Sequence, residues 1–501
     1  MMKRWFVVLM VVVAVFRLTL LERGELAFVD ETFYFTSVMA VQSLAAGDIH
    51  GAVAALDKAR GRQGATLLQL PVAALQAIPS HFGVPASNLR SLLIPAVCNV
   101  AVTLLTLWLF FAICLAVCDD EWAALAAAVV YALLVNTNLY VRHMVPYDWA
   151  LCLGMGALWL GITRRGTIAN VALAGWLIGM LVTTYTGYYL LACVAGAVVV
   201  GQAWRADGWL RAVRAAVVFG AAAVSVVGAM ELLFRAGGSS YLANVMAVRR
   251  DIAFSSIDDG WMFLPEYLVI VERLAGVVLL VGVAAYAWRV GVRVFRRDVC
   301  LVDYLLLPAV LAWTVQSASS AQWHAIPLFG RLLHPWMPFL AWALADTLAA
   351  INRSTVRAAA CAAVVCAAVV SSVVSARVYY RLAYPSSVLY ALGIDTTRLS
   401  EDQMLCELNP GTWYASPAPL DRVTGYPYTS SDRFLLLNFC QALMVVPQPR
   451  LTAAIRPDAR LIYDGPHWMS FPAYAFEGLT HADRAAMADN NYRVRAYRLG
   501  K

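Results

Sequence analysis

The stretch Phe28-Val29-Asp30-Glu31-Thr32-Phe33-Tyr34 places two adjacent carboxylates among aromatic residues. It comes directly after the first long apolar run, Trp5 to Leu21. If that run spans a membrane, Asp30 and Glu31 lie just beyond its far end, where the first large loop begins. Carboxylates at that place contribute nothing to anchoring, so we interpret the pair as part of an active site at the membrane surface, with the later spans packed around it.

The chemistry of this pair supports the interpretation. A carboxylate at the edge of a low-dielectric region holds a proton more readily than in water, which suits a general base that takes a proton from a hydroxyl. Adjacent side chains need not point the same way, so Asp30 and Glu31 can divide into an acting and a supporting group. The alternative is a solvated loop start, and the aromatic neighbours argue against it because they would partly bury the carboxylates.

The composition indicates a polytopic membrane protein. Hydrophobic residues are 61% of the 501 residues and charged residues only 14%, whereas an average soluble chain carries about 25% charged residues. Most of the net charge of +7 comes from short basic clusters between apolar runs, the pattern of topology signals and not of a nucleic-acid-binding surface. Arginine far outnumbers lysine, as in GC-rich bacterial genomes, which favours the bacterial plasma (inner) membrane as location.

About eleven apolar runs are long enough to cross a bilayer as helices. The segment from 168 to 204 is too long for one span, so we expect it to break at the polar, glycine-containing residues 183–189. Arginine and lysine in the short loops place the N-terminus inside, and the Asp30 loop and the C-terminal region outside. The expected spans are approximately 5–21, 91–117, 122–141, 146–163, 168–184, 187–204, 212–234, 264–288, 301–317, 332–350 and 358–376.

The expected fold is therefore an all-α polytopic membrane domain, residues 1–376, followed by a small extracytoplasmic C-terminal α/β domain, residues 377–501. The large first outer loop, 22–88, contains the amphipathic pieces 33–44 and 67–78, which are suited to the membrane interface. We interpret residues 1–21 as a retained first span and not as a cleaved signal peptide.

In the C-terminal region, 459–464 and 493–499 are predicted as strands, and a helix is predicted to start at Thr480. Cys406 and Cys440 lie in this polar region, where an extracytoplasmic location would permit a disulfide between them. The other cysteines lie in or beside apolar runs, where cysteine behaves as a small hydrophobic residue.

Two further clusters fall on the same membrane face as Asp30. The first holds Arg142 and Asp148, for which the alternatives are snorkelling to the interface and capping of the fourth span. The second holds Arg331 and His334, where an arginine fork can bind phosphate, with an interfacial anchor as the alternative. We expect a set of tyrosines at the predicted break to lie in an interfacial aromatic belt: Tyr185, Tyr188 and Tyr189.

The sequence lacks a Walker loop, a dinucleotide fingerprint, an HExxH zinc helix and a GxSxG elbow. No nucleotide site is therefore predicted. An outward-facing enzyme has poor access to cytoplasmic nucleotide sugars, whereas a lipid-linked donor reaches it through the bilayer.

Taken together, these motifs resemble the GT-C superfamily of integral-membrane glycosyltransferases, and within it the group of protein O-mannosyltransferases and the bacterial aminoarabinose transferase acting on lipid A. The resemblance rests on the order and spacing of several short motifs. They are Asp30-Glu31-x-x-Tyr34 followed by Ala40, Leu44 and Gly47-Asp48, then Asn88-Leu89-Arg90, Arg142 and Asp148, and Arg331-x-x-x-Pro335-x-x-Pro338. The family often carries Lys-Pro-Pro in the first loop, where this chain has the segment 60–66, so Lys58, Arg60 or Arg62 would take the place of that lysine.

The resemblance implies an inverting transfer of a sugar from polyprenyl phosphate to a hydroxyl on a lipid, glycan or protein. Asp30 would be the general base and Glu31 its support. The leaving phosphate would be bound by cations, and two side chains would orient the acceptor or a cation, while the need for a divalent metal stays open. The expected phosphate ligands are Arg142, Arg331, His334, Arg62 and Lys58, and the expected orienting residues are Asp148 and Tyr34.

Two alternatives belong to other classes of protein. The first is a transporter or flippase for a lipid-linked substrate, because intramembrane charge marks such pathways; Glu231 and Asp346 are the main candidates for such charge. The second is an inactive scaffold, suggested by the missing Lys-Pro-Pro.

Overall fold

The structure is a computed structural model of the whole chain. It describes residues 2–21, 33–59, 61–78, 93–141, 143–163, 167–253, 260–326 and 328–379, and four strands further on. Asp30, Glu31 and Arg142 therefore lie outside the described residues.

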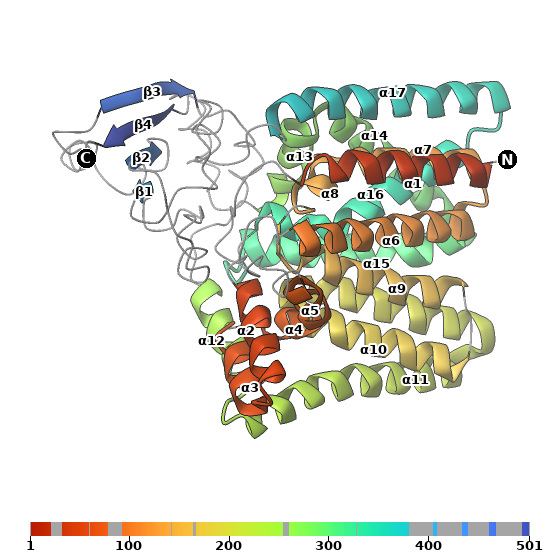
Figure 1. Cartoon of the computed structure of the whole chain (residues 1–501). Coiled ribbons are helices and arrows are strands. Elements are labelled where there is room, and N and C mark those ends of the chain that lie inside the picture. The colour runs from red at the N-terminus through yellow and green to blue at the C-terminus, as the bar shows by residue number, and fades with distance from the viewer. Residues whose placement is uncertain are drawn as a thin grey trace.

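Long helices run side by side as a bundle (Figure 1), and the described chain is helical in every range where a span was predicted. Five segments are long and apolar enough to cross a membrane: Leu93–Cys118, Thr186–Ala236, Gly260–Phe295, Leu301–Ala321 and Ser354–Ser375. The number of crossings and their orientation remain predictions. The main helices are α1 (Met2–Leu18), α6 (Leu93–Cys118), α7 (Glu121–Leu133), α9 (Tyr147–Thr163), α10 (Ile168–Thr184), α11 (Tyr189–Ala236), α14 (Arg273–Phe295), α15 (Leu301–Ala321), α16 (Met337–Ala349) and α17 (Ser354–Tyr379).

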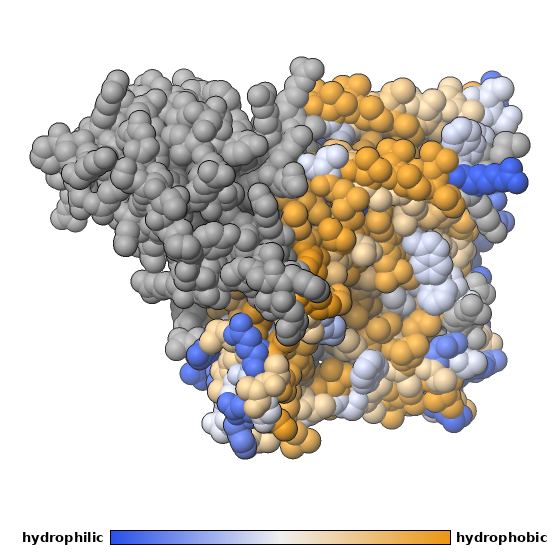
Figure 2. All heavy atoms as spheres, viewed as in Figure 1, coloured by the Kyte–Doolittle hydropathy of each residue, from blue (hydrophilic) through white to orange (hydrophobic). Residues whose placement is uncertain are grey.

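The surface of the bundle fits a bilayer. Figure 2 shows a broad hydrophobic area over the helices, with hydrophilic residues gathered toward their ends. On α1, for example, Val7, Val11 and Val15 are exposed although they are apolar. Such a surface is stable where hydrocarbon replaces water as the solvent. The protein is an integral membrane protein.

Helix α11 is two helices joined by a sharp break. Asp207 has φ −143° and ψ 20°, and Gly208 has φ 82° and ψ −169°. A positive φ is readily adopted only by glycine, so Gly208 permits the chain to reverse here. The two halves match the two spans predicted for 187–204 and 212–234.

Glycines bring α10 against the second half of α11. A Cβ on Gly175 or Gly179 would meet the backbone carbonyl of Phe219 or Ala223. Small residues at such contacts let helix backbones approach closely, which is how helices associate in lipid. The chain from α9 to the end of α11 thus forms one tightly packed block.

The first long loop contains short helices: α2 (Tyr34–Ala45), α3 (Ile49–Asp57), α4 (Gln63–Leu68) and α5 (Leu70–Ala77). The predicted amphipathic pieces 33–44 and 67–78 fall on α2 and across α4 and α5, and their place in the membrane interface stays a prediction. Gly64 lies so close to the carbonyl of Thr183 that a Cβ has no room. This contact attaches α4 to the end of α10. Beyond α11, the chain continues as α12 (Tyr241–Ala253).

The segment before α14 is irregular. It runs from α13 (Phe263–Tyr267) through a π-helical turn, η5 (Leu268–Glu272), into α14. Arg273 has φ 56°, an uncommon conformation for a residue with a side chain. π-Turns inside helices are frequent at functional sites, and this one directs Glu272 into the protein.

The C-terminal region contains one sheet, of order β1-β2-β4-β3. β1 pairs parallel to β2, and β4 pairs antiparallel to both β2 and β3. Strands β3 and β4 fall where strands were predicted. The predicted helix at Thr480 and Cys440, and with it the disulfide, lie outside the described residues, so a C-terminal α/β domain stays a prediction. The strands are β1 (Met404–Glu407), β2 (Arg433–Asn438), β3 (Arg460–Pro466) and β4 (Arg493–Leu499).

Candidate active site

Several short helices meet at the end of the bundle where α9 begins and α10 ends. They are α8 (Val135–Leu139), η3 (Thr186–Tyr188), η6 (Gly330–Leu332) and η7 (His334–Trp336). Each interrupts or precedes a long helix, so each exposes backbone groups and directs polar side chains inward. This end of the bundle therefore holds the buried polar groups that a membrane-embedded site requires.

His334 is at the centre of this cluster. Its Nδ1 lies 2.8 Å from Oδ1 of Asn136, and its Nε2 lies 3.1 Å from Oδ1 of Asp148. All three side chains are buried. Asp148 is in the first turn of α9, and its carboxylate contacts the imidazole of His334. Its role at a functional site stays a prediction.

The hydrogen bonds around Asn136 determine where protons sit on His334. Nδ2 of Asn136 donates to the carbonyl of Gly330 at 3.2 Å and to the hydroxyl of Tyr267 at 2.9 Å. A carbonyl only accepts, so Oδ1 of Asn136 faces His334, and Nδ1 of the ring carries a proton. His334 thus connects Asn136 and Asp148 through its two ring nitrogens.

Glu272 stabilises the start of α8, the helix that carries Asn136. Its carboxylate accepts the backbone N–H groups of Val135 at 2.7 Å and Asn136 at 2.8 Å. Those are the first N–H groups of α8, which have no partner within the helix, and a carboxylate is favoured at a helix N-terminus. Glu272 therefore fixes α8, and through it Asn136 and His334.

Arg331 lies next to this pair and is also buried. Its Nη1 donates to the hydroxyl of Tyr147 at 2.9 Å, and its carbonyl accepts from the hydroxyl of Tyr188 at 3.1 Å. Tyr147 directly precedes Asp148. The guanidinium of Arg331 is thus held by Tyr147, the residue next to Asp148 in the first turn of α9.

Tyrosine rings enclose the cluster. Tyr185 makes edge contacts with Tyr147 and Tyr188, with ring centroids 4.9 Å and 4.8 Å apart, and Tyr140 makes an edge contact with His334 at 5.5 Å. The prediction that Tyr185 and Tyr188 belong to an interfacial belt is wrong, since both are buried, whereas Tyr189 is 37% exposed. The break after α10 turns these two rings inward.

Arg62 joins the cluster from the first loop. Its guanidinium lies over the ring of Tyr185, 4.8 Å from the centroid. Such stacking favours a cation beside an aromatic ring. Arg62 and Arg331 thus contact the same group of tyrosines, through Tyr185 and Tyr147, and the role of Arg62 as the first-loop cation stays a prediction.

Two other predicted residues lie elsewhere. The hydroxyl of Tyr34 donates to Gln76 at 2.5 Å, and burial raises the pKa of Tyr34, so the hydroxyl keeps its proton. Tyr34 packs against Val72 and Met144, and its role in orienting the acceptor or a cation stays a prediction. Lys58 is exposed at the end of α3, and no described contact connects it with His334 or Arg331.

The sequence does not decide whether the protein binds a metal ion. Within the described ranges, no three His, Cys, Asp or Glu side chains gather in a way that would hold a metal ion. The adjacent carboxylates Asp30 and Glu31 are not part of those ranges. The need for a divalent cation therefore remains as the sequence left it.

The chain resembles two solved membrane transferases. ArnT from Cupriavidus metallidurans bound to undecaprenyl phosphate matches 98% of this chain and 98% of its own, at 12% identity and a TM-score of 0.49. Archaeal oligosaccharyltransferase AglB from Archaeoglobus fulgidus, in complex with an inhibitory peptide and a dolichol-phosphate, matches 76% of this chain at 12% identity and a TM-score of 0.46. This chain covers 56% of the length of AglB.

Both solved proteins are GT-C glycosyltransferases, the superfamily that the sequence motifs resemble. No protein-family model matches the sequence, and no curated protein does either. The chemistry of the site is therefore argued below from its own residues.

Sequence reasoning missed Asn136 and Glu272. Asn136 belongs to the polar run Asn136-Thr137-Asn138 inside an otherwise apolar stretch, and Glu272 is a lone carboxylate inside the predicted span 264–288. Polar and ionisable residues at such positions are expensive in lipid and usually functional. Asn136 and Glu272 both meet this criterion, whereas the sequence prediction named only Glu231 and Asp346.

Proposed function

We propose that the chain is a membrane glycosyltransferase that moves a sugar, with inversion, from a polyprenyl-phosphate donor to a hydroxyl acceptor at the outer membrane face. The observation that carries the proposal is the buried cluster in which His334 bridges Asp148 and Asn136 while Arg331 is held on Tyr147. It brings a guanidinium and a hydrogen-bonded imidazole–carboxylate pair together at one end of the helix bundle.

The donor phosphate is assigned to the cations of this cluster. In the reaction the bond between the anomeric carbon and the phosphate oxygen breaks, so negative charge grows on the leaving polyprenyl phosphate. Arg331 and Arg62 are proposed to stabilise that charge; their contacts with Tyr147 and Tyr185 support this assignment. The proposal adds His334 and Arg142, which follows Val141 and precedes the segment leading to α9.

The acceptor side is assigned to Asp30, supported by Glu31. Asp30 takes the proton of the acceptor hydroxyl as its oxygen forms the new bond to the anomeric carbon, opposite the departing phosphate. The configuration at that carbon then inverts. Asp148 holds the imidazole of His334 in place through its contact with Nε2.

The charges inside the bundle favour this reading over a transporter. Glu272 is occupied by the start of α8. Asp303 pairs with Arg293 at 2.6 Å, and Asp346 with Arg289 at 3.0 Å. Among the described residues, these buried carboxylates are thus held by fixed structural partners, whereas a transport pathway needs charges that exchange partners.

The decisive experiment is transfer of radiolabel from a panel of polyprenyl-phosphate sugars in membranes. Three proteins are compared: wild type, Asp30→Asn and His334→Gln. We expect label to reach an acceptor with one donor in wild type, to be abolished in Asp30→Asn and to fall strongly in His334→Gln. His50→Gln on α3, which is exposed, is the matched control. Full transfer by Asp30→Asn, or none by folded wild type with any donor, would overturn the proposal.

A further inference from the structure

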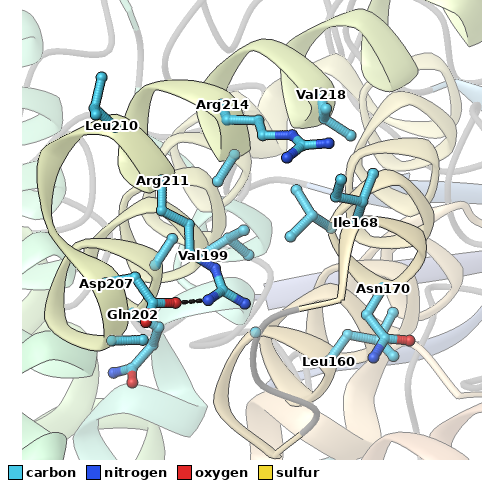
Figure 3. Close-up of a pocket in the computed structure, with 15 residues that line it drawn as sticks. Leu160, Ile168, Asn170, Val199, Gln202, Asp207, Leu210, Arg211, Arg214 and Val218 are labelled. Carbon is cyan, nitrogen blue, oxygen red and sulfur yellow. Dashed lines mark ion pairs between the residues drawn. The ribbon is translucent and has the colours of Figure 1, made fainter.

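A cavity of about 610 Å³ lies between the end of α9, the start of α10 and the break in α11. Figure 3 shows Arg211 and Arg214 reaching toward it from the second half of α11. Its size lies within the range of about 300–1,000 Å³ that small-molecule sites occupy. The feature is therefore large enough to hold part of an organic ligand.

The cavity is separate from the candidate active site. Gly161 lines it, whereas Asp148 begins the same helix, α9. At a rise of 1.5 Å per residue the two positions are about 20 Å apart along the axis. The cavity is thus at the end of the bundle opposite the candidate active site. It lies next to loops that the sequence predicts to be on the inner side of the membrane.

The polar side of the cavity is positive. Arg211 forms an ion pair with Asp207, but no acidic partner of Arg214 is found among the described residues. The second half of α11 and α10 both begin here, and helix N-termini favour anions. Nε2 of Gln202, a buried residue of the lining, also lacks a hydrogen-bond partner in the described structure. These donors together are complementary to a single negative charge.

The other side of the cavity is apolar. Side chains from three helices form this wall, and none carries a polar group: Leu160, Ile168, Val171, Val199 and Val218. A small hydrophilic anion would leave this surface unfilled, whereas an acyl chain would bury it at about 25 cal/mol per Å² of apolar area. The ligand must therefore be both anionic and hydrocarbon-bearing.

We propose that this cavity binds one anionic phospholipid. Its phosphate lies between Arg214 and Arg211, a headgroup oxygen accepts from Gln202, and the upper part of one acyl chain lies on the valine-rich wall. The membrane supplies such a ligand directly, because the cavity lies where the arginine-containing turns meet the bilayer. The ligand holds the two halves of α11 together across the break at Gly208.

The test is native mass spectrometry of the purified full-length protein in detergent, titrated with phosphatidylglycerol or with phosphatidylcholine. We expect one phosphatidylglycerol molecule to bind at least about fivefold more tightly than phosphatidylcholine, as the loss of one cationic contact implies. Arg214→Gln should remove that preference. Arg235 is at the C-terminal end of the same helix, and its side chain is 70% exposed. The variant Arg235→Gln should retain the preference.

A second variant tests the apolar wall. Val218→Trp fills the space beside Arg214 and should lower the affinity for phosphatidylglycerol while both arginines remain. Equal binding of the two lipids by wild type would overturn the proposal, as would unchanged phosphatidylglycerol binding by Arg214→Gln. Displacement of the lipid by millimolar inorganic phosphate would also overturn it, since that would show a simple anion site.

Discussion

Nε2 of His334 lies 3.1 Å from the carboxylate of Asp148, a residue 186 positions earlier in the chain. Both side chains are buried, so the pair is shielded from water and its attraction is strong. The contact joins the start of α9 to the turn before α16. Asp148 and His334 are therefore each positioned by a helical segment.

Replacement of Asp148 by Asn should lower sugar transfer by about 10²-fold, the usual effect of removing one electrostatic contact in a buried site. The amide has nearly the same shape but carries no negative charge beside the imidazole of His334. The measurement is kcat/KM for the donor, with the thermal midpoint recorded in parallel. Asp298→Asn, at an exposed turn, is the control. A large fall in thermal midpoint at unchanged kcat/KM would show that the pair is only structural.

Replacement of Glu272 by Gln should destabilise the protein by about 1–3 kcal/mol. A carboxamide has one accepting oxygen, so one of the two N–H groups of α8 would face an NH₂ group and lose its hydrogen bond. The midpoint of thermal unfolding, followed by size-exclusion chromatography, measures this. Glu121→Gln, at the exposed start of α7, should change the midpoint little. Equal midpoints for the two variants would contradict the capping role of Glu272.

Replacement of Arg331 by Lys should raise the donor KM by about tenfold and leave the fold intact. Lysine keeps the charge, but it lacks the planar fork that holds Tyr147 with one arm and phosphate with the others. Initial rates at varied donor concentration provide the KM. Arg353→Lys, at the exposed start of α17, is the comparison. An unchanged KM for Arg331→Lys would remove this residue from the phosphate site.

The stacking of Arg62 on Tyr185 is tested by two substitutions at the tyrosine. Tyr185→Leu removes the ring and should raise the donor KM about threefold, since an exposed to half-buried cation–π contact contributes about 0.5–1 kcal/mol. Tyr185→Phe keeps the ring and should behave as wild type. Identical kinetics for the leucine and phenylalanine variants would show that Arg62 is positioned by other contacts.

The sequence was most informative where one physical requirement dominates. Crossing a bilayer requires about 20 apolar residues, and each predicted span contains a helix. The turn after residue 183 and the break near Gly208 were also predictable, because polar and glycine residues interrupt long apolar runs. Asp148, Arg331, His334 and Arg62 were proposed as site residues from their charge near span ends; the structure brings His334 and Asp148 into contact, and the roles of all four stay predictions.

What could not be predicted depends on distant pairings. Nothing local to Glu272 shows that its carboxylate caps a helix that starts at Val135, or that Asn136 contacts His334. Tyr185 and Tyr188 carry the same local pattern as belt residues, and only the direction of the turn buries them. Such relationships belong to tertiary structure, where contacts between residues more than 100 positions apart decide which side chains face inward.

The cap on α8 also determines when the site can form during synthesis. Val135 and Asn136 leave the ribosome long before Glu272, and His334 follows later still. Until those segments are inserted, the start of α8 has unpaired N–H groups at membrane depth, and Asp148 has no imidazole beside it. This end of the bundle is thus assembled last, so a chain truncated before Arg331 would insert its early helices without completing the proposed site.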